Sequence, residues 1–90
     1  MKIEFDPAKR LRTLEQRALD MDQASQVFSG MKLTIVDDRK DYGEPRWITF
    51  GFLNARMVVV VWTNRGDNLR IISMRKANDK EQKIFRGRMG

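Results

Sequence analysis

The feature that most constrains this 90-residue chain is the run 57–63, which reads Met-Val-Val-Val-Val-Trp-Thr. β-Branched and aromatic residues favour strands, and a strand that is apolar on both of its faces is buried on both. The run therefore predicts a strand in the middle of a sheet. A chain of this length forms a single domain, residues 1–90, which must be organised around that strand.

Three more strands are expected on either side of this run. Residues 33–36 are rich in β-formers, residues 46–52 alternate between two faces, and residues 69–75 follow a polar turn at 64–68. Residues 53–56 form the hairpin connection before the central strand. Because the connections are short, the sequence favours a four-stranded antiparallel meander.

Helix signals stand before and after the strands. Asp6-Pro7 predicts a capped helix start with Leu11 and Leu14 in its apolar stripe, and a second helix is expected from Asp20 to Ser29. A closing helix is expected over 79–86, with fraying beyond it.

The predicted fold class is therefore α+β. It comprises two N-terminal helices, a four-stranded antiparallel sheet and a C-terminal helix, with all helices on one face of the sheet.

Net charge is the first indication of function. The chain has 18 Lys and Arg against 12 Asp and Glu, a formal net charge of +6, and most of the cations are Arg. Arg offers a planar donor pair that matches phosphate, so the balance favours a polyanionic partner, either nucleic acid or an acidic protein segment.

The residue types that are missing exclude several chemistries. The chain has no His and no Cys, so catalysis by a histidine base, a Cys–His pair or a zinc site of the usual ligands is excluded. No Gly-rich phosphate loop is present, and no cofactor is expected. Four acidic residues at 37–44 do not have the spacing of a calcium loop and contain intervening cations, so a solvated turn is favoured over a metal site.

Arginines on the predicted strands are the main candidates for a site. A strand packed against helices holds Arg only where the guanidinium reaches solvent or an anion. We expect a cationic surface with a hydroxyl beside it, in which alternation places Arg70 with Met74, and Arg75 with Ser73, on opposite faces. The candidates are Arg46, Arg65, Arg70 and Arg75, with Thr63 or Ser73 as the hydroxyl. The alternative is that these arginines pair with Asp37, Glu44 or Asp67 on a solvated face.

Three other side chains have possible roles. Glu44 lies where the acidic turn meets the strand of Arg46, where it is a candidate general base or the partner of Arg46 or Lys40 in a salt bridge. Trp47 is a candidate for stacking on a base, whereas Trp62 is expected in the core.

The chain is expected to act in the cytoplasm. Its first six residues are too charged for a signal peptide, and no apolar run approaches the ~18 residues of a membrane span.

Four stretches resemble one family. Residues 5–9, 43–49, 59–66 and 70–77 are similar to the BrnT toxins, and the resemblance covers almost the whole chain. It implies a RelE-like ribonuclease fold and a role in a bacterial type II toxin–antitoxin pair. The partner it implies is a BrnA-like antitoxin with a ribbon-helix-helix part, so that operator DNA would be bound only through the antitoxin, in a possible hetero-tetramer.

The first helix departs from the family pattern. Lys9 is kept, but Thr13 stands where the family has Asn, and Gln16-Arg17-Ala18 stands where it has Lys-His-Gly. If that His takes part in cleavage, this chain must use another group or be weakened. If that His is structural, Arg17 can replace it, because a cation suits a helix C-terminus.

The leading hypothesis is a metal-independent endoribonuclease that inhibits translation. Arg65, Arg70 and Arg75 would hold the scissile phosphate, and Lys9 or Glu44 would be the base. The residues expected to bind RNA around them are Arg46, Trp47, Thr63, Ser73 and Lys76. The alternative is a weakened or non-catalytic module that acts with the antitoxin in operon repression. Direct binding of duplex DNA is less favoured, since no pair of helices has a helix-turn-helix pattern.

Overall fold

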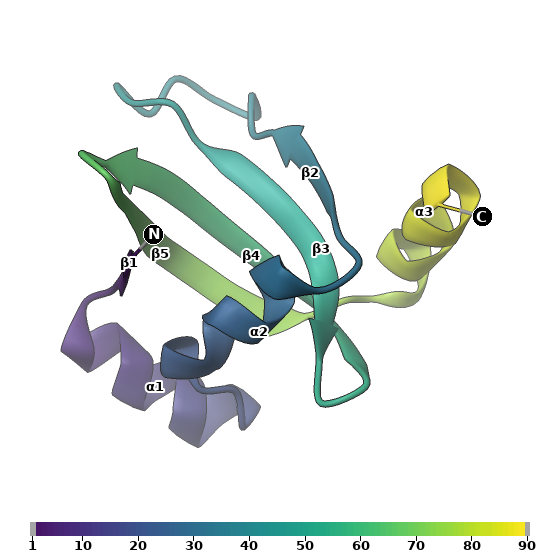
Figure 1. Cartoon of the computed structure of the whole chain (residues 1–90), viewed down its shortest axis with the longest axis horizontal. Helices are drawn as coiled ribbons and strands as arrows, with labels where there is room; N and C mark the ends of the chain where they lie inside the picture. Colours follow the sequence, from purple (N-terminus) through teal and green to yellow (C-terminus); the bar gives the residue numbers. More distant parts are fainter. Residues whose placement is uncertain (1, 90) are drawn as a thin grey trace.

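The computed structural model describes residues 2–89, and for Met89 the backbone alone. A five-stranded mixed sheet in the order β1-β5-β4-β3-β2 forms its centre (Figure 1). The strands are β1 (Lys2–Glu4), β2 (Leu33–Val36), β3 (Trp47–Leu53), β4 (Arg56–Arg65) and β5 (Asn68–Lys76). The predicted central strand is confirmed, because β4 occupies the middle of the sheet and its four valines are buried.

The predicted strand count and orientation were wrong at one edge. Strands β2 to β5 form the expected antiparallel meander, but β1 adds a fifth strand that runs parallel to β5, with Ile3 opposite Leu69. A three-residue strand with charges at both ends has no alternation to detect. Its partner lies at the other end of the chain, so no local signal predicts the pairing.

The helices are α1 (Pro7–Arg17), the short 3-10 helix η1 (Met21–Gln23), α2 (Ala24–Ser29) and α3 (Asp79–Met89). Asp6 caps α1 by accepting a hydrogen bond from the backbone N–H of Ala8 at 2.9 Å, as its position before Pro7 predicts. Helix α3 continues through Met89, three residues beyond the predicted end. None of these helices, within residues 2–89, is long and apolar enough to cross a membrane.

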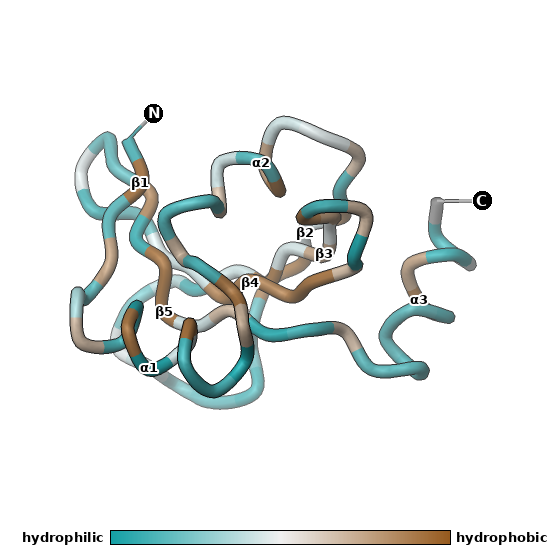
Figure 2. Tube along the Cα trace, turned by 90° about the horizontal axis from the view of Figure 1, so that it is seen from below, coloured by the Kyte–Doolittle hydropathy of each residue, from teal (hydrophilic) through white to brown (hydrophobic). Residues whose placement is uncertain are grey.

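The helices cover both faces of the sheet, which corrects the prediction of one covered face. The first face is covered by the segment between the end of α1 and the end of α2, which contributes Leu19, Met21 and Val27. The second face is covered by Phe85 of α3. Figure 2 shows the hydrophobic stretch of β4 near the centre of the view, between α1 and α2, with α3 at the end of the view opposite β1. Because β4 is apolar on both faces, each face must be shielded from water.

Helix α1 buries a different side from the predicted one. Leu11 and Leu14 of the expected apolar stripe are 57% and 41% exposed, whereas Thr13 is only 8% exposed. The period of the apolar residues predicted the helix correctly. It did not show which side meets β5, because that depends on how the chain enters the helix from β1.

A β-bulge in β5 changes which residues share a face. Trp62 lies opposite Ile71, but Val61 lies opposite Ser73, so Ile72 is the extra residue. Beyond the bulge the alternation is shifted by one position. Arg70, Ser73 and Arg75 therefore lie opposite Thr63, Val61 and Val59, which are alternate residues of β4. The expectation that Arg70 and Arg75 occupy opposite faces was wrong for this reason.

Candidate RNA-binding and catalytic site

Cationic side chains converge on a cavity where β4 ends and β5 begins. The cavity has a volume of about 170 Å³. Its charged and polar lining residues are Asp6, Lys9, Glu44, Arg46, Thr63, Arg65 and Arg70. We call it the β4–β5 cavity. Four cations and two carboxylates face it, so it suits an anion.

Four separate segments position these side chains. Lys9 lies in the first turn of α1, which the cap at Asp6 holds beside β5. Arg46 directly precedes β3, and Arg65 ends β4. Arg70 lies near the start of β5, opposite Thr63. The sheet register and the α1 cap together therefore bring residues from both halves of the chain to one place.

Thr63 connects the sheet to the segment before β3. Its side chain is 1% exposed, and its hydroxyl donates a hydrogen bond to the backbone carbonyl of Pro45. This contact holds the Glu44–Arg46 segment against the end of β4. The hydroxyl proton is already used, so Thr63 acts on the cavity mainly by positioning its neighbours.

Glu44 and Arg46 both line the cavity and contact each other. The Arg46 Nε donates to a Glu44 carboxylate oxygen at 3.2 Å, and the guanidinium lies 4.0 Å from the centre of the Tyr42 ring. Among the described residues, Lys9, Arg65 and Arg70 make no ion pair of their own. Three cations thus remain available for an anionic ligand, beside a carboxylate that can accept a proton.

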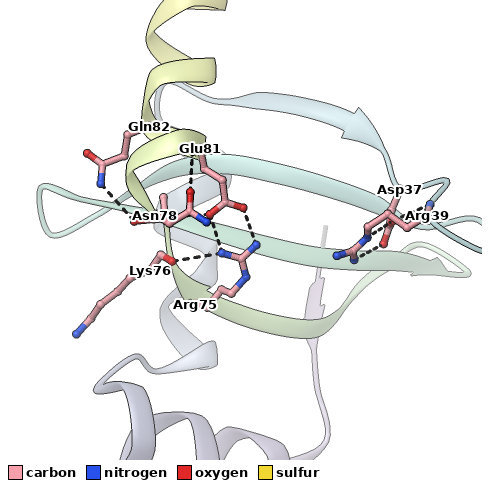
Figure 3. Close-up of polar contacts among 8 residues, drawn as sticks. Asp37, Arg39, Arg75, Lys76, Asn78, Glu81 and Gln82 are labelled. Carbon is pink, nitrogen blue, oxygen red and sulfur yellow. Dashed lines mark hydrogen bonds and ion pairs between the residues drawn. The ribbon is translucent and has the colours of Figure 1, made fainter.

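Arg75 lies outside the β4–β5 cavity. It shares a sheet face with Arg70 but is five residues further along β5, which corresponds to roughly 16 Å of strand. Both of its terminal nitrogens contact the Glu81 carboxylate of α3, at 2.7 and 2.6 Å (Figure 3). These hydrogen bonds raise the pKa of the Arg75 guanidinium and lower the pKa of Glu81.

The remaining predicted binding residues are dispersed. Trp47 faces away from Arg46 and stacks on Trp62, with ring centres 4.9 Å apart, in the layer that packs with α2. Lys76 lies at the far end of β5 beside Arg56. Ser73 lines a second cavity, which adjoins the first beneath α1.

The acidic turn is partly buried. Asp37 is 4% exposed and accepts hydrogen bonds from Arg39 at 2.7 and 2.8 Å, which lower its pKa to about 2. Asp38 and Asp41 are exposed, as expected for a solvated turn. Within the described residues, no three acidic side chains are grouped in a way that would hold a metal ion.

Sequence reasoning missed a further cation near α3. Arg39, held by Asp37, extends back over the sheet toward Arg75, as Figure 3 shows, and its charge contributes to the lowered pKa of Glu81. In the sequence, Arg39 follows Asp37 and Asp38 and precedes Lys40 and Asp41, and this mixture of charges suggested only a solvated turn. The burial of Asp37 depends on contacts that no local pattern reveals.

The end of α1 explains one departure from the family pattern. Arg17 lies in the last turn and donates to the backbone carbonyl of Met74 in β5 at 2.9 Å. β1 pairs with β5 only as far as Arg70, so this carbonyl lies on an edge that no strand within residues 2–89 covers. Arg17 therefore has a structural contact at the position where the family has His.

A family profile described as "Ribonuclease toxin, BrnT, of type II toxin-antitoxin system" matches residues 5–81. No curated protein shows a significant match to the chain. The matched segment contains every residue that lines the β4–β5 cavity, together with Arg75 and Glu81. The chain therefore belongs to the BrnT family of ribonuclease toxins of type II toxin–antitoxin systems.

Proposed function

We propose that this BrnT protein is a metal-independent endoribonuclease whose active site is the β4–β5 cavity. The observation that carries the proposal is the convergence of four cations from separate segments beside two carboxylates, of which Glu44 is the proposed base. The substrate would be RNA, because its 2′-hydroxyl is an internal nucleophile and the protein then needs to supply none of its own.

The reaction needs one proton acceptor and one proton donor. The 2′-oxygen of the substrate attacks the adjacent phosphorus, and Glu44 takes the 2′-hydroxyl proton. The bond from phosphorus to the 5′-oxygen then breaks, and the Lys9 ammonium protonates that oxygen. The products are a 2′,3′-cyclic phosphate and a free 5′-hydroxyl. A carboxylate is ordinarily ionised at neutral pH, which favours Glu44 over Lys9 as the base.

Arg65 and Arg70 would stabilise the additional negative charge that develops on phosphorus oxygens. Guanidinium groups suit this role because they remain charged and donate two parallel hydrogen bonds. By analogy with an oxyanion donor, removal of one such group costs about 10²–10³ in kcat. Arg46 would position Glu44, to which it is hydrogen-bonded. Arg75 would anchor α3 and would not contact the scissile phosphate.

The biological role follows from the family. A type II toxin has a protein antitoxin as its partner. The antitoxin proposed here is BrnA-like, with a ribbon-helix-helix part through which the complex binds operator DNA, as a hetero-tetramer. RNA cleavage in the cytoplasm would inhibit translation and growth. The basic surface suits an acidic antitoxin segment, whose charge would accelerate association.

The proposal is tested by incubating the purified protein with 5′-labelled RNA in excess EDTA. Endonucleolytic products that carry a 2′,3′-cyclic phosphate are expected. Intact RNA, together with normal growth when the protein is induced without antitoxin, would instead support the non-catalytic module that the absence of His suggests. Cleavage that requires added divalent metal would contradict the mechanism but not the ribonuclease assignment.

A further inference from the structure

A second cavity adjoins the β4–β5 cavity under α1. Its volume is about 310 Å³, and it shares Lys9 and Ile72 with the first cavity. We call it the α1–β5 cavity. Its residues are Lys9, Arg12, Thr13, Gln16, Arg17, Met21, Ile72 and Ser73. Apart from Lys9, none of these residues takes part in the proposed cleavage reaction.

The polar groups of this cavity suit an anion. Its lining contains three cations and no carboxylate, whereas two carboxylates line the β4–β5 cavity. Thr13 is the buried polar residue of α1, at 8% exposure. Its hydroxyl and that of Ser73 make no hydrogen bond to any described residue, although threonine in a helix commonly bonds a carbonyl one turn back. Ser73 is partly exposed, and no fully buried side-chain oxygen or nitrogen of the described residues lacks a partner, so both hydroxyls reach the cavity surface and can donate to a ligand.

The fold explains why the cavity exists. Lys9, Thr13 and Gln16 are spaced by one helical turn, so they lie on the side of α1 that faces β5. β1 ends its pairing at Arg70, and the bulge at Ile72 interrupts the strand just beyond it. The edge of β5 at Ser73 is therefore covered by α1 side chains and not by another strand.

We propose that the α1–β5 cavity binds a second phosphate of the same RNA strand, next to the phosphate held in the β4–β5 cavity. This inference rests on the proposed function for the identity of the strand. Lys9 lines both cavities and would lie between consecutive phosphates. The substrate must then extend at least one nucleotide past the scissile bond. The recognition is of the backbone, through cations and hydroxyl donors, and carries no base preference.

The test uses an eight-nucleotide 2′-O-methyl RNA, which binds but cannot be cleaved because its nucleophile is blocked. Binding is followed by fluorescence anisotropy across a range of salt concentrations. Arg12→Gln removes a cation of this cavity that is exposed and makes no ion pair with any residue that the structure describes. The matched control is Arg88→Gln, an exposed Arg of α3 that lines neither of the two cavities.

Arg12→Gln should make the plot of log affinity against log salt shallower by about 0.7, the value for one phosphate contact on a single strand. Arg88→Gln should leave the slope unchanged. Thr13→Val, which keeps the shape and removes the hydroxyl, should weaken binding, and Thr13→Ser should restore it. Slopes that are equal for Arg12→Gln and Arg88→Gln would overturn the proposal.

Cleavage of ordinary RNA separates this inference from the proposed function. If Arg12→Gln shows the expected change of slope but the wild-type protein never cleaves RNA, the second phosphate site stands and the ribonuclease mechanism fails. If it cleaves, and Arg12→Gln matches Arg88→Gln in both slope and cleavage, the second site fails and the mechanism stands.

Discussion

The guanidinium of Arg75 and the carboxylate of Glu81 form a bidentate ion pair, with nitrogen–oxygen distances of 2.7 and 2.6 Å. Glu81 also accepts a hydrogen bond from the backbone N–H of Asn78, whose side chain accepts one from the backbone N–H of Glu81. One carboxylate thus completes the capping box of α3 and links that helix to β5. This relationship assigns Arg75 to the anchoring of α3.

Replacing Glu81 should therefore loosen α3. Glu81→Gln keeps a residue that suits the capping box but removes the ion pair, so the free energy of unfolding should fall by about 1 kcal/mol. Urea denaturation followed by circular dichroism measures the change. Glu15→Gln, an exposed residue of α1 with the same chemical change, is the control and should have little effect.

The cavity arginines and Arg75 should differ in their effect on cleavage. Arg70→Ala is expected to lower kcat by about 10²–10³, because it removes a cation from the β4–β5 cavity. Arg75→Ala should lower kcat less than tenfold under conditions where the variant is folded, while reducing its stability. Cleavage rates of the two variants are measured on labelled RNA at one common temperature, 20 °C below the lower of their two Tm values. Equal losses for both would return Arg75 to the active site.

Glycine at the C-cap of α1, position 18, should stabilise the protein. Ala18 has a left-handed backbone, with φ of 57°, which disfavours any side chain. Ala18→Gly should therefore raise the free energy of unfolding by about 0.5–1 kcal/mol. Ala8→Gly, the same change at a right-handed position within α1, should lower it by a similar amount. Thermal or urea unfolding of both variants gives the comparison, and a destabilised Ala18→Gly would contradict the expectation.

Stability should decline in acid partly because of Asp37. Arg39 holds the pKa of Asp37 at about 2, below its ordinary 3.8, so protonation opposes folding. The stabilisation is complete above pH 3.8 and is lost as the pH falls from there to about 2. Asp37→Asn should cost about 1–2 kcal/mol at neutral pH and flatten the decline of Tm in that interval.

The exposed neighbour of Asp37 supplies the control for this measurement. Asp38→Asn should leave both the neutral Tm and its acid dependence close to those of the unchanged protein. An Asp37→Asn variant with the same acid profile as Asp38→Asn would show that the ion pair between Asp37 and Arg39 does not contribute.

Local patterns were sufficient for several elements of this protein. The cap at Asp6, the box between Asn78 and Glu81 and the hairpin after Leu53 each depend on residues two or three positions apart. The central strand was predictable as well, because its composition alone requires burial. For the site, the residue types indicated an anion-binding surface, and Lys9, Glu44, Arg46, Arg65 and Arg70 do meet in one cavity.

What the sequence by itself determined, then, is the identity of the helices and antiparallel strands and the cationic character of the site. Only the tertiary structure decided that β1 pairs parallel with β5, that the bulge at Ile72 turns Arg70 and Ser73 to one face, and that Glu81 binds Arg75. The physical reason is the separation along the chain of the residues that interact. Caps and hairpins are governed by neighbours along the chain, whereas strand register and ion pairs between elements depend on how distant segments pack.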